Sequence, residues 1–275
     1  MYQHYKRLAH ALATGSEKLS QRTGCVVRRC GARALMVDKH PATIAIARIC
    51  SCYHTAQQSP PARNPMTTMI IDMFSDIVCP WCIIGGARLE QAIAQRPDIT
   101  FERHWHPYML NPDQQPGVDF KSYIAQRFGG NARSSEMFAQ VTQAAASEGI
   151  TFDFDSITTS PNTRDAHRLM MMAEELGKTW ELAPFLYYGH FRDSLDLNDH
   201  AVLCDLAVQA GLPKADVEAV LANGMYNDHV DASLVTAQRL NITGVPFFIF
   251  NRKLALSGAQ SPEIMLQAID QAMSS

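Results

Sequence analysis

The fold is decided by one short stretch, Ser75-Asp76-Ile77-Val78-Cys79-Pro80-Trp81-Cys82-Ile83-Ile84-Gly85. Directly before this stretch, the apolar run at 69–74 predicts a short buried strand. A helical pattern runs from Cys79 to about Gln95, with a proline in its first turn, where a missing N–H costs nothing. Alternating residues at 99–105 predict a second strand. Strand, helix and strand in succession predict a βαβ unit, in which a helix connects two parallel strands.

The Cys-x-x-Cys motif lies where this strand meets this helix, and that position gives it a chemical meaning. A thiolate at a helix N-terminus is stabilised by free backbone N–H groups and by the positive end of the helix dipole. Cys79 is therefore the predicted nucleophile, and Cys82 is close enough to attack a mixed disulfide and release the substrate. Pro80 helps to fix the turn, while Trp81 lacks the ionisable side chain that a histidine would offer.

The alternative role for a Cys-x-x-Cys motif is one half of a zinc site, which needs two further ligands. Residues 66–275 contain neither a second Cys-x-x-Cys nor a pair of histidines at zinc-binding spacing. The only other cysteine of this region, Cys204, lies in an apolar helical pattern and is predicted to be buried in the core. A redox role is favoured, and no metal is predicted.

The rest of the chain completes a second half of the fold. Residues 113–240 are predicted to be helical, and strand patterns return at 245–250 and 254–257 before a closing helix at about 262–273. The order is βαβ, then a helical insertion, then ββα, which places the sheet-forming domain in 66–112 and 241–275. The predicted helices of the insertion are about 119–128, 133–148, 163–177, 179–193, 199–210, 213–222 and 227–240.

Four spaced motifs give this pattern a family resemblance. The chain resembles the DsbA family of thiol–disulfide oxidoreductases, an α/β family with a helical domain inserted in a thioredoxin fold, and within it the FrnE-type branch. The resemblance covers about residues 69–273. Its motifs are the stretch 75–85, the loop His106-Pro107-Tyr108-Met109-Leu110-Asn111-Pro112, the helix start Asn162-Thr163-Arg164-Asp165-Ala166-His167-Arg168-Leu169, and Thr243-Gly244-Val245-Pro246-Phe247-Phe248 through Ser257-Gly258-Ala259-Gln260.

The resemblance implies further site residues. Pro246 is expected to be a cis-proline opposite the cysteines, with the backbone of Val245 free to pair with an extended substrate. Asn162, His167 and Ser257 are candidate cleft residues, and His167 either lines the cleft or packs as an ordinary helix histidine. No bound cofactor is expected, with glutathione a candidate thiol co-substrate. The expected partners are protein or small-molecule thiols and disulfides.

The charge distribution separates residues 1–65 from the rest. That segment carries ten Lys and Arg and two Asp and Glu, a net charge of +8, whereas residues 66–275 carry −11. The basic segment is interpreted as an N-terminal extension. Three origins are open for it: an organelle transit peptide, a disordered arm, or residues upstream of the biological start. The acidic remainder argues against nucleic-acid binding, and no apolar run is long enough to span a membrane. A cytoplasmic location is expected, while the sequence leaves the oligomeric state open.

The predicted function is that of a dithiol–disulfide oxidoreductase, whose direction of electron flow the sequence leaves open. The rival enzyme class is that of the glutathione-dependent 2-hydroxychromene-2-carboxylate isomerases and kappa-class glutathione transferases. Those enzymes typically carry a serine where Cys79 stands, so retention of both Cys79 and Cys82 argues against them. A third hypothesis is a redox-sensing or chaperone-like binding module that uses the Met-rich run at 169–172, although that run is more typical of core packing.

Overall fold

The predicted βαβ unit is present in the computed structural model, which describes residues 67–274. Strand β1 (Thr67–Ser75) leads into helix α2 (Pro80–Ala94), which returns the chain to strand β2 (Ile99–Pro107). The two strands are parallel and pair over their whole length, from Thr67 opposite Ile99 to Ser75 opposite Pro107. The predictions for residues 1–65 lie outside the described residues.

The C-terminal part adds two antiparallel strands to the same sheet. Strands β5 (Phe247–Phe250) and β6 (Leu254–Ser257) form the predicted hairpin, and helix α10 (Pro262–Ser274) follows. Because β5 pairs antiparallel with β1, the strand order is β2-β1-β5-β6. The hairpin turn places Asn251 at φ 50° and Arg252 at φ 57°, in the left-handed conformation that tight hairpins require. These elements form the thioredoxin fold that the sequence predicts.

Seven helices separate the two halves of the sheet, close to the predicted boundaries. Two short strands that the sequence did not predict, β3 (Val118–Asp119) and β4 (Thr159–Ser160), pair with each other within this insertion. They are too short to show a strand period. The helices are α3 (Phe120–Phe128), α4 (Asn131–Ser147), α5 (Arg164–Glu175), α6 (Thr179–Phe191), α7 (His200–Gln209), α8 (Lys214–Ala222) and α9 (Asn227–Arg239).

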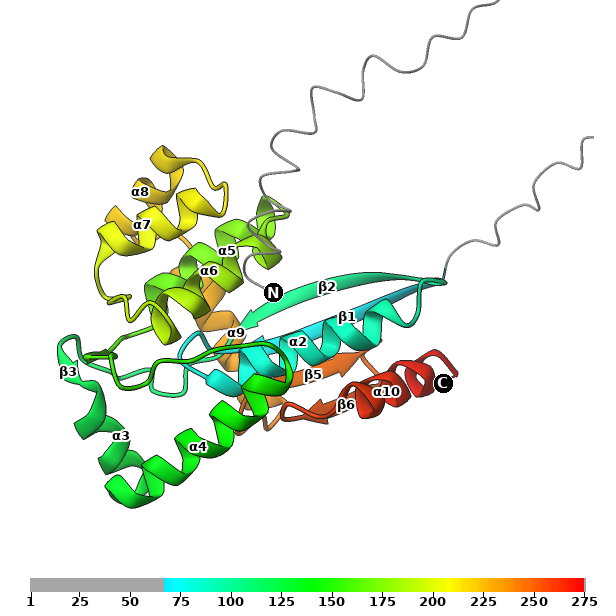
Figure 1. Ribbon diagram of the computed structural model, residues 1–275. Coiled ribbons are helices and arrows are strands. Elements are labelled where there is room, and N and C mark those ends of the chain that lie inside the picture. The colour runs from blue at the N-terminus through cyan, green and yellow to red at the C-terminus, as the bar shows by residue number, and fades with distance from the viewer. Residues whose placement is uncertain (1–66, 275) are drawn as a thin grey trace, which may run out of the picture. The chain divides into compact units, whose positions relative to one another are not determined.

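The central strand β1 is covered on both faces. Helices α2 and α10 lie side by side along one face of the sheet, and Met69, Ile71 and Met73 of β1 are buried in the core cluster that includes α2 (Figure 1). The neighbouring residue Phe74 packs with Ala237 of α9 in a separate cluster. This alternation follows from the period of two along a strand. The end of β1 is consequently fixed from both sides, directly before the Cys-x-x-Cys motif.

Two sequence predictions concern packing within the insertion. The Met-rich run of α5 lies in the core, with Met170 and Met172 buried, which confirms the packing interpretation. Cys204 of α7 is also buried, as predicted. Within residues 67–274, no helix is both long enough and apolar enough to cross a membrane.

Candidate active site

The two motif cysteines lie at the N-terminal end of α2, as free thiols. Cys79 is the residue just before the helix, with extended φ and ψ of −99° and 107°, and Pro80 is the first helical residue. The backbone N–H of Cys82 donates to the Cys79 carbonyl at 2.9 Å, which closes the first turn. Cys79 is 4% exposed and Cys82 is 0% exposed, so Cys79 is the more accessible thiol.

The surroundings of Cys82 hold its proton in place. Burial raises the pKa of the Cys82 thiol well above its usual value, and the hydrogen bond and charge interaction with Cys79 raise it further. A hydrogen bond from the Ser75 hydroxyl and one from the Asp76 backbone N–H act in the opposite direction. The thiol proton therefore stays on Cys82 in the reduced pair. Cys79 is left as the sulfur that can attack a substrate.

The loop before β5 lies against the nucleophile. The Val245–Pro246 peptide bond is cis, as the family resemblance implied. The Cys79 thiol donates to the Val245 carbonyl at 3.4 Å. Gly258 N–H in turn donates to the Pro246 carbonyl at 2.8 Å, which ties this loop to the end of β6. The Cys79 sulfur and the loop at Val245 and Pro246 are thus in contact, although they are far apart in the sequence.

Cys79 opens onto a cavity of about 250 Å³ that extends toward α3 and α4. Its wall is largely apolar and aromatic, and Arg127 and the buried His190 add polar groups to it. Cys79 is part of this wall, although the residue as a whole is almost fully buried. The wall includes Val78, Cys79, Pro80, Trp81, Leu110, Phe120, Tyr123, Ile124, Phe128, Met137, Phe138, Phe154, Phe191 and Val245.

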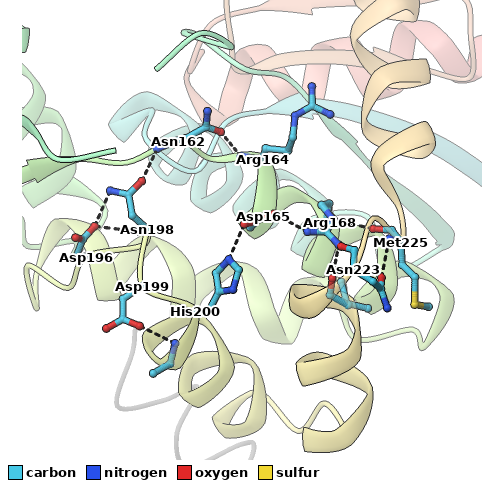
Figure 2. Close-up of polar contacts among 12 residues, drawn as sticks. Asn162, Arg164, Asp165, Arg168, Asp196, Asn198, Asp199, His200, Asn223 and Met225 are labelled. Carbon is cyan, nitrogen blue, oxygen red and sulfur yellow. Dashed lines mark hydrogen bonds and ion pairs between the residues drawn. The ribbon is translucent and has the colours of Figure 1, made fainter. Parts of the chain in front are cut away.

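The wall of this cavity does not include the three candidate cleft residues, whose roles stay predictions. Asn162 lies between two wall residues, but its side chain donates to the Gln114 carbonyl at 2.9 Å and accepts from the Arg164 N–H at 3.0 Å, a contact drawn in Figure 2. Its amide therefore joins two loops instead of facing a substrate. Ser257 is exposed at the end of β6, opposite Phe247.

His167 is fully buried behind the active-site loop. Its Nε2 lies 3.2 Å from Asp76 Oδ1 and 3.0 Å from the Tyr108 carbonyl. The other carboxylate oxygen of Asp76 accepts from the Leu110 N–H at 2.7 Å. Of the two roles left open by the sequence, packing is the one observed, and His167 contacts the loop through Asp76.

Four residues near the cysteines were not predicted from the sequence as site candidates: Ser75, Asp76, Tyr187 and His190. Ser75 and Asp76 belong to the stretch that decides the fold, and their position shortly before Cys79 was a usable signal. Tyr187 and His190 of α6 gave no signal, because only the tertiary fold brings them to the site. Ser75 Oγ and Tyr187 OH are 2.6 Å apart, and both side chains are buried.

A thioredoxin fold with an inserted helical domain and two thiols at a helix N-terminus defines a DsbA-like class of protein. Residues 70–270 match the model of the DSBA-like thioredoxin domain. The chain belongs to this family of thiol–disulfide oxidoreductases, which confirms the predicted family, whereas the FrnE-type branch stays a prediction.

The chain is also similar to individual proteins. The chain is 34% identical to a probable DsbA oxidoreductase from Streptomyces coelicolor, with a TM-score of 0.70 over 75% of this chain and 90% of that chain. It is 27% identical over 208 residues to the uncharacterized protein YwbO of Bacillus subtilis (strain 168), covering 74% of this chain and 96% of YwbO. The cytosolic disulfide reductase DsbM from Pseudomonas aeruginosa, solved with GSH, shares the fold at 18% identity and a TM-score of 0.55, over 75% of this chain and all of that chain.

Gly85 sets the distance between α2 and the cis-proline loop. A methyl group added there would lie 2.8 Å from Pro246 Cγ and 3.3 Å from Phe248 Cζ, whereas one added at Gly86 would meet only Met73 Cε, at 3.9 Å. We expect Gly85→Ala to lower the free energy of unfolding by about 1–3 kcal/mol through overpacking. Gly86→Ala should raise it by up to about 1 kcal/mol, because alanine favours the helix. Urea unfolding of both variants checks this, and equal stabilities would contradict it.

His190 should make the protein sensitive to acid. Burial lowers the pKa of His190 from 6.5 to about 4, although a hydrogen bond to the Leu195 backbone opposes the shift. Between these values the unfolded chain binds a proton that the folded chain does not, so stability falls as the pH falls. From about pH 6.5 to about pH 5 the loss is about 2 kcal/mol.

Urea unfolding at about pH 7 and about pH 5 tests this expectation. His190→Gln can keep a side-chain donor near the Leu195 backbone but does not titrate, so the acid-induced loss should shrink by about 2 kcal/mol. His229→Gln, which changes an exposed histidine of α9, is the matched control and should leave the loss unchanged. An unaltered pH dependence in His190→Gln would show that His190 is not the responsible group.

Proposed function

We propose that this protein exchanges disulfides through Cys79 and Cys82. The observation that carries the proposal is the pair of free thiols at the start of α2, in which Cys79 meets the cavity and Cys82 holds its proton. Cys79 thiolate attacks one sulfur of a substrate disulfide, and the other substrate sulfur leaves as a thiolate. Cys82 then attacks Cys79, which forms the Cys79–Cys82 disulfide and releases the second substrate thiolate.

The loop at Val245 and Pro246 is the proposed substrate-positioning element. An extended peptide bound beside Cys79 would pass the Val245 backbone, whose carbonyl already lies within reach of the sulfur. Pro80 and Trp81, both in the cavity wall, would contact the groups that flank the reacting disulfide. We propose protein and small-molecule thiols and disulfides as partners.

Glutathione is the proposed small-molecule co-substrate. The cytosolic reductase from Pseudomonas aeruginosa that shares this fold was solved with GSH. A glutathione thiolate could reduce the Cys79–Cys82 disulfide in two exchange steps and leave as glutathione disulfide. We place the protein in the cytoplasm and, within its family, in the FrnE-type branch.

Two assays test the proposal directly. We expect the protein to catalyse the reduction of insulin disulfides by dithiothreitol or glutathione. We also expect it to show neither glutathione conjugation nor isomerisation of 2-hydroxychromene-2-carboxylate. The opposite result would favour the glutathione-dependent isomerase or transferase class. Measurement of the Cys79–Cys82 reduction potential would then give the direction of electron flow.

A further inference from the structure

A buried chain of hydroxyl groups ends at the resolving cysteine. Ser75, the last residue of β1, lies with its Oγ 2.6 Å from the hydroxyl of Tyr187 on α6. The Ser75 hydroxyl also acts on the buried Cys82 thiol, whose pKa it lowers, as a donor to the thiolate would. Three elements, β1, α6 and α2, thus contribute one group each to the chain. Ser75 and Cys82 are wholly buried and Tyr187 nearly so, which makes the contacts strong if they are satisfied and costly if they are broken.

The chain has a preferred direction of donation. Each hydroxyl group carries one proton, so if Ser75 donates to Cys82, Tyr187 must be the donor in its hydrogen bond with Ser75. Burial raises the pKa of the Tyr187 phenol well above its ordinary value, and the nearby Cys82 raises it further. Tyr187 therefore stays protonated and remains able to donate. In this arrangement, protons point from Tyr187 to Ser75 and from Ser75 to the Cys82 sulfur.

The mixed disulfide changes what Cys82 experiences. In the reduced enzyme, the hydrogen bond and charge interaction with Cys79 help to keep Cys82 protonated. Once the Cys79 sulfur is bonded to substrate, it carries neither a proton nor a charge, so both interactions are lost. Burial still opposes the Cys82 thiolate, and the donors that favour it are the Ser75 hydroxyl and the Asp76 backbone N–H.

We propose that Ser75 and Tyr187 are positioning residues for the resolution step, a role that rests on the proposed function. Ser75 donates to the Cys82 thiolate, and Tyr187 orients Ser75. The thiolate attacks Cys79, the Cys79–Cys82 bond forms, and the electron pair of the broken disulfide leaves with the substrate sulfur. The proton that Cys82 loses passes to solvent, from which the released thiolate can recover one.

Other charged groups near Cys82 are already paired. The Asp76 carboxylate is bound by the Leu110 N–H and by His167. A second cavity of about 210 Å³, which Cys82 and Tyr187 both line, contains the ion-paired side chains of Glu90 and Arg103. Substitution of Ser75 or Tyr187 leaves all of these groups in place. A change in the pH dependence of resolution then reports on the hydroxyl chain itself.

Stopped-flow mixing with Ellman's reagent, an aromatic disulfide that releases a coloured thiol, separates the two steps. Attack by Cys79 releases one coloured thiol, and resolution by Cys82 releases the second. We expect Ser75→Ala and Tyr187→Phe to slow the second phase by about tenfold or more at neutral pH and to move its midpoint to higher pH. The first phase should keep its rate, because the Cys79 thiol hydrogen-bonds to the Val245 carbonyl and not to either hydroxyl.

Matched variants make the result decisive. Tyr188→Phe, which removes the hydroxyl of the adjacent buried tyrosine, should leave both phases unchanged. Ser75→Thr keeps a hydroxyl and should restore most of the rate that Ser75→Ala loses. In a Cys79→Ala background, which lacks the interactions of the Cys79 sulfur, ultraviolet thiolate absorbance should show Cys82 ionising at higher pH when Tyr187→Phe is added.

The outcomes distinguish this role from the function it rests on. An unchanged second phase in Ser75→Ala and Tyr187→Phe, or equal slowing of both phases, would overturn the positioning role. If wild-type protein released only one coloured thiol for each chain, the proposed dithiol exchange itself would fail. A slower second phase with an unchanged first phase, together with the shifted pH midpoint, supports both the positioning role and the dithiol exchange.

Discussion

Replacement of Cys79 by serine is expected to abolish disulfide exchange, with a loss on the order of a thousandfold or more. A hydroxyl group ionises far less readily than a thiol, and it cannot form a disulfide with the substrate. Cys82 does not substitute for Cys79, because it is fully buried and its pKa is raised. Insulin reduction and Ellman's reagent both measure the loss.

Cys82→Ser should separate capture from release. Cys79 still attacks the substrate disulfide, but no neighbouring thiolate displaces the bound partner, so mixed disulfides accumulate. Nonreducing gels and mass spectrometry of acid-quenched samples should show substrate attached to Cys79. Cys204→Ser removes the other free thiol of the described residues and is the matched control, because Cys204 lies on α7, outside the wall of the active-site cavity.

The same pair of variants discriminates between enzyme classes. In a glutathione-dependent isomerase or transferase the reacting thiol belongs to the co-substrate, and Cys82 only fills space. Cys79→Ser would then keep activity, and Cys82→Ser would trap nothing. An active Cys79→Ser protein would therefore contradict the proposed dithiol chemistry, whereas trapping by Cys82→Ser together with an inactive Cys79→Ser supports it.

Much of the fold could be predicted from local patterns. Strand β1 and helix α2 follow from periodicity and from the proline at the first helical position, and the glycines around α3 mark where the helices end. The position of the two cysteines at the helix start follows from the same pattern. The cis bond at Pro246 came from family resemblance, since no local pattern distinguishes a cis from a trans proline there.

The surroundings of the cysteines could not be predicted in this way. Ser75 and Tyr187 are 112 positions apart, and their contact depends on how α6 packs against β1 and α2. His190 resembles any helix histidine until its burial beside the cavity is known. Asn162 lay in a motif that pointed to the cleft, yet its amide bonds neighbouring loops. The direction of the Asn162 side chain is set by these hydrogen bonds, which the sequence motif does not reveal.

The motif that contains His167 also carries a residue that holds the insertion together. Arg168 of α5 is buried, and its guanidinium donates to the carbonyls of Val220, Asn223 and Met225, where α8 ends and the chain turns toward α9. It also donates to Asp165 at 2.6 Å. Figure 2 shows the guanidinium pointing at this turn, with His200 on the other side of Asp165. One side chain thus satisfies several carbonyls that the end of a helix leaves open.

We expect Arg168→Met to lower the free energy of unfolding by about 3–5 kcal/mol, because it keeps the apolar stem but leaves buried carbonyls without donors. Arg168→Lys should recover only part of the loss, since an ammonium group cannot reproduce the planar set of donors. Arg164→Met, four residues earlier, removes a largely exposed pair with Asp231 and should cost at most about 1 kcal/mol. Urea unfolding measures all three. Because α5 also places His167 behind Asp76, Arg168→Met should slow disulfide exchange as well, and equal stabilities of Arg168→Met and Arg164→Met would contradict this role for Arg168.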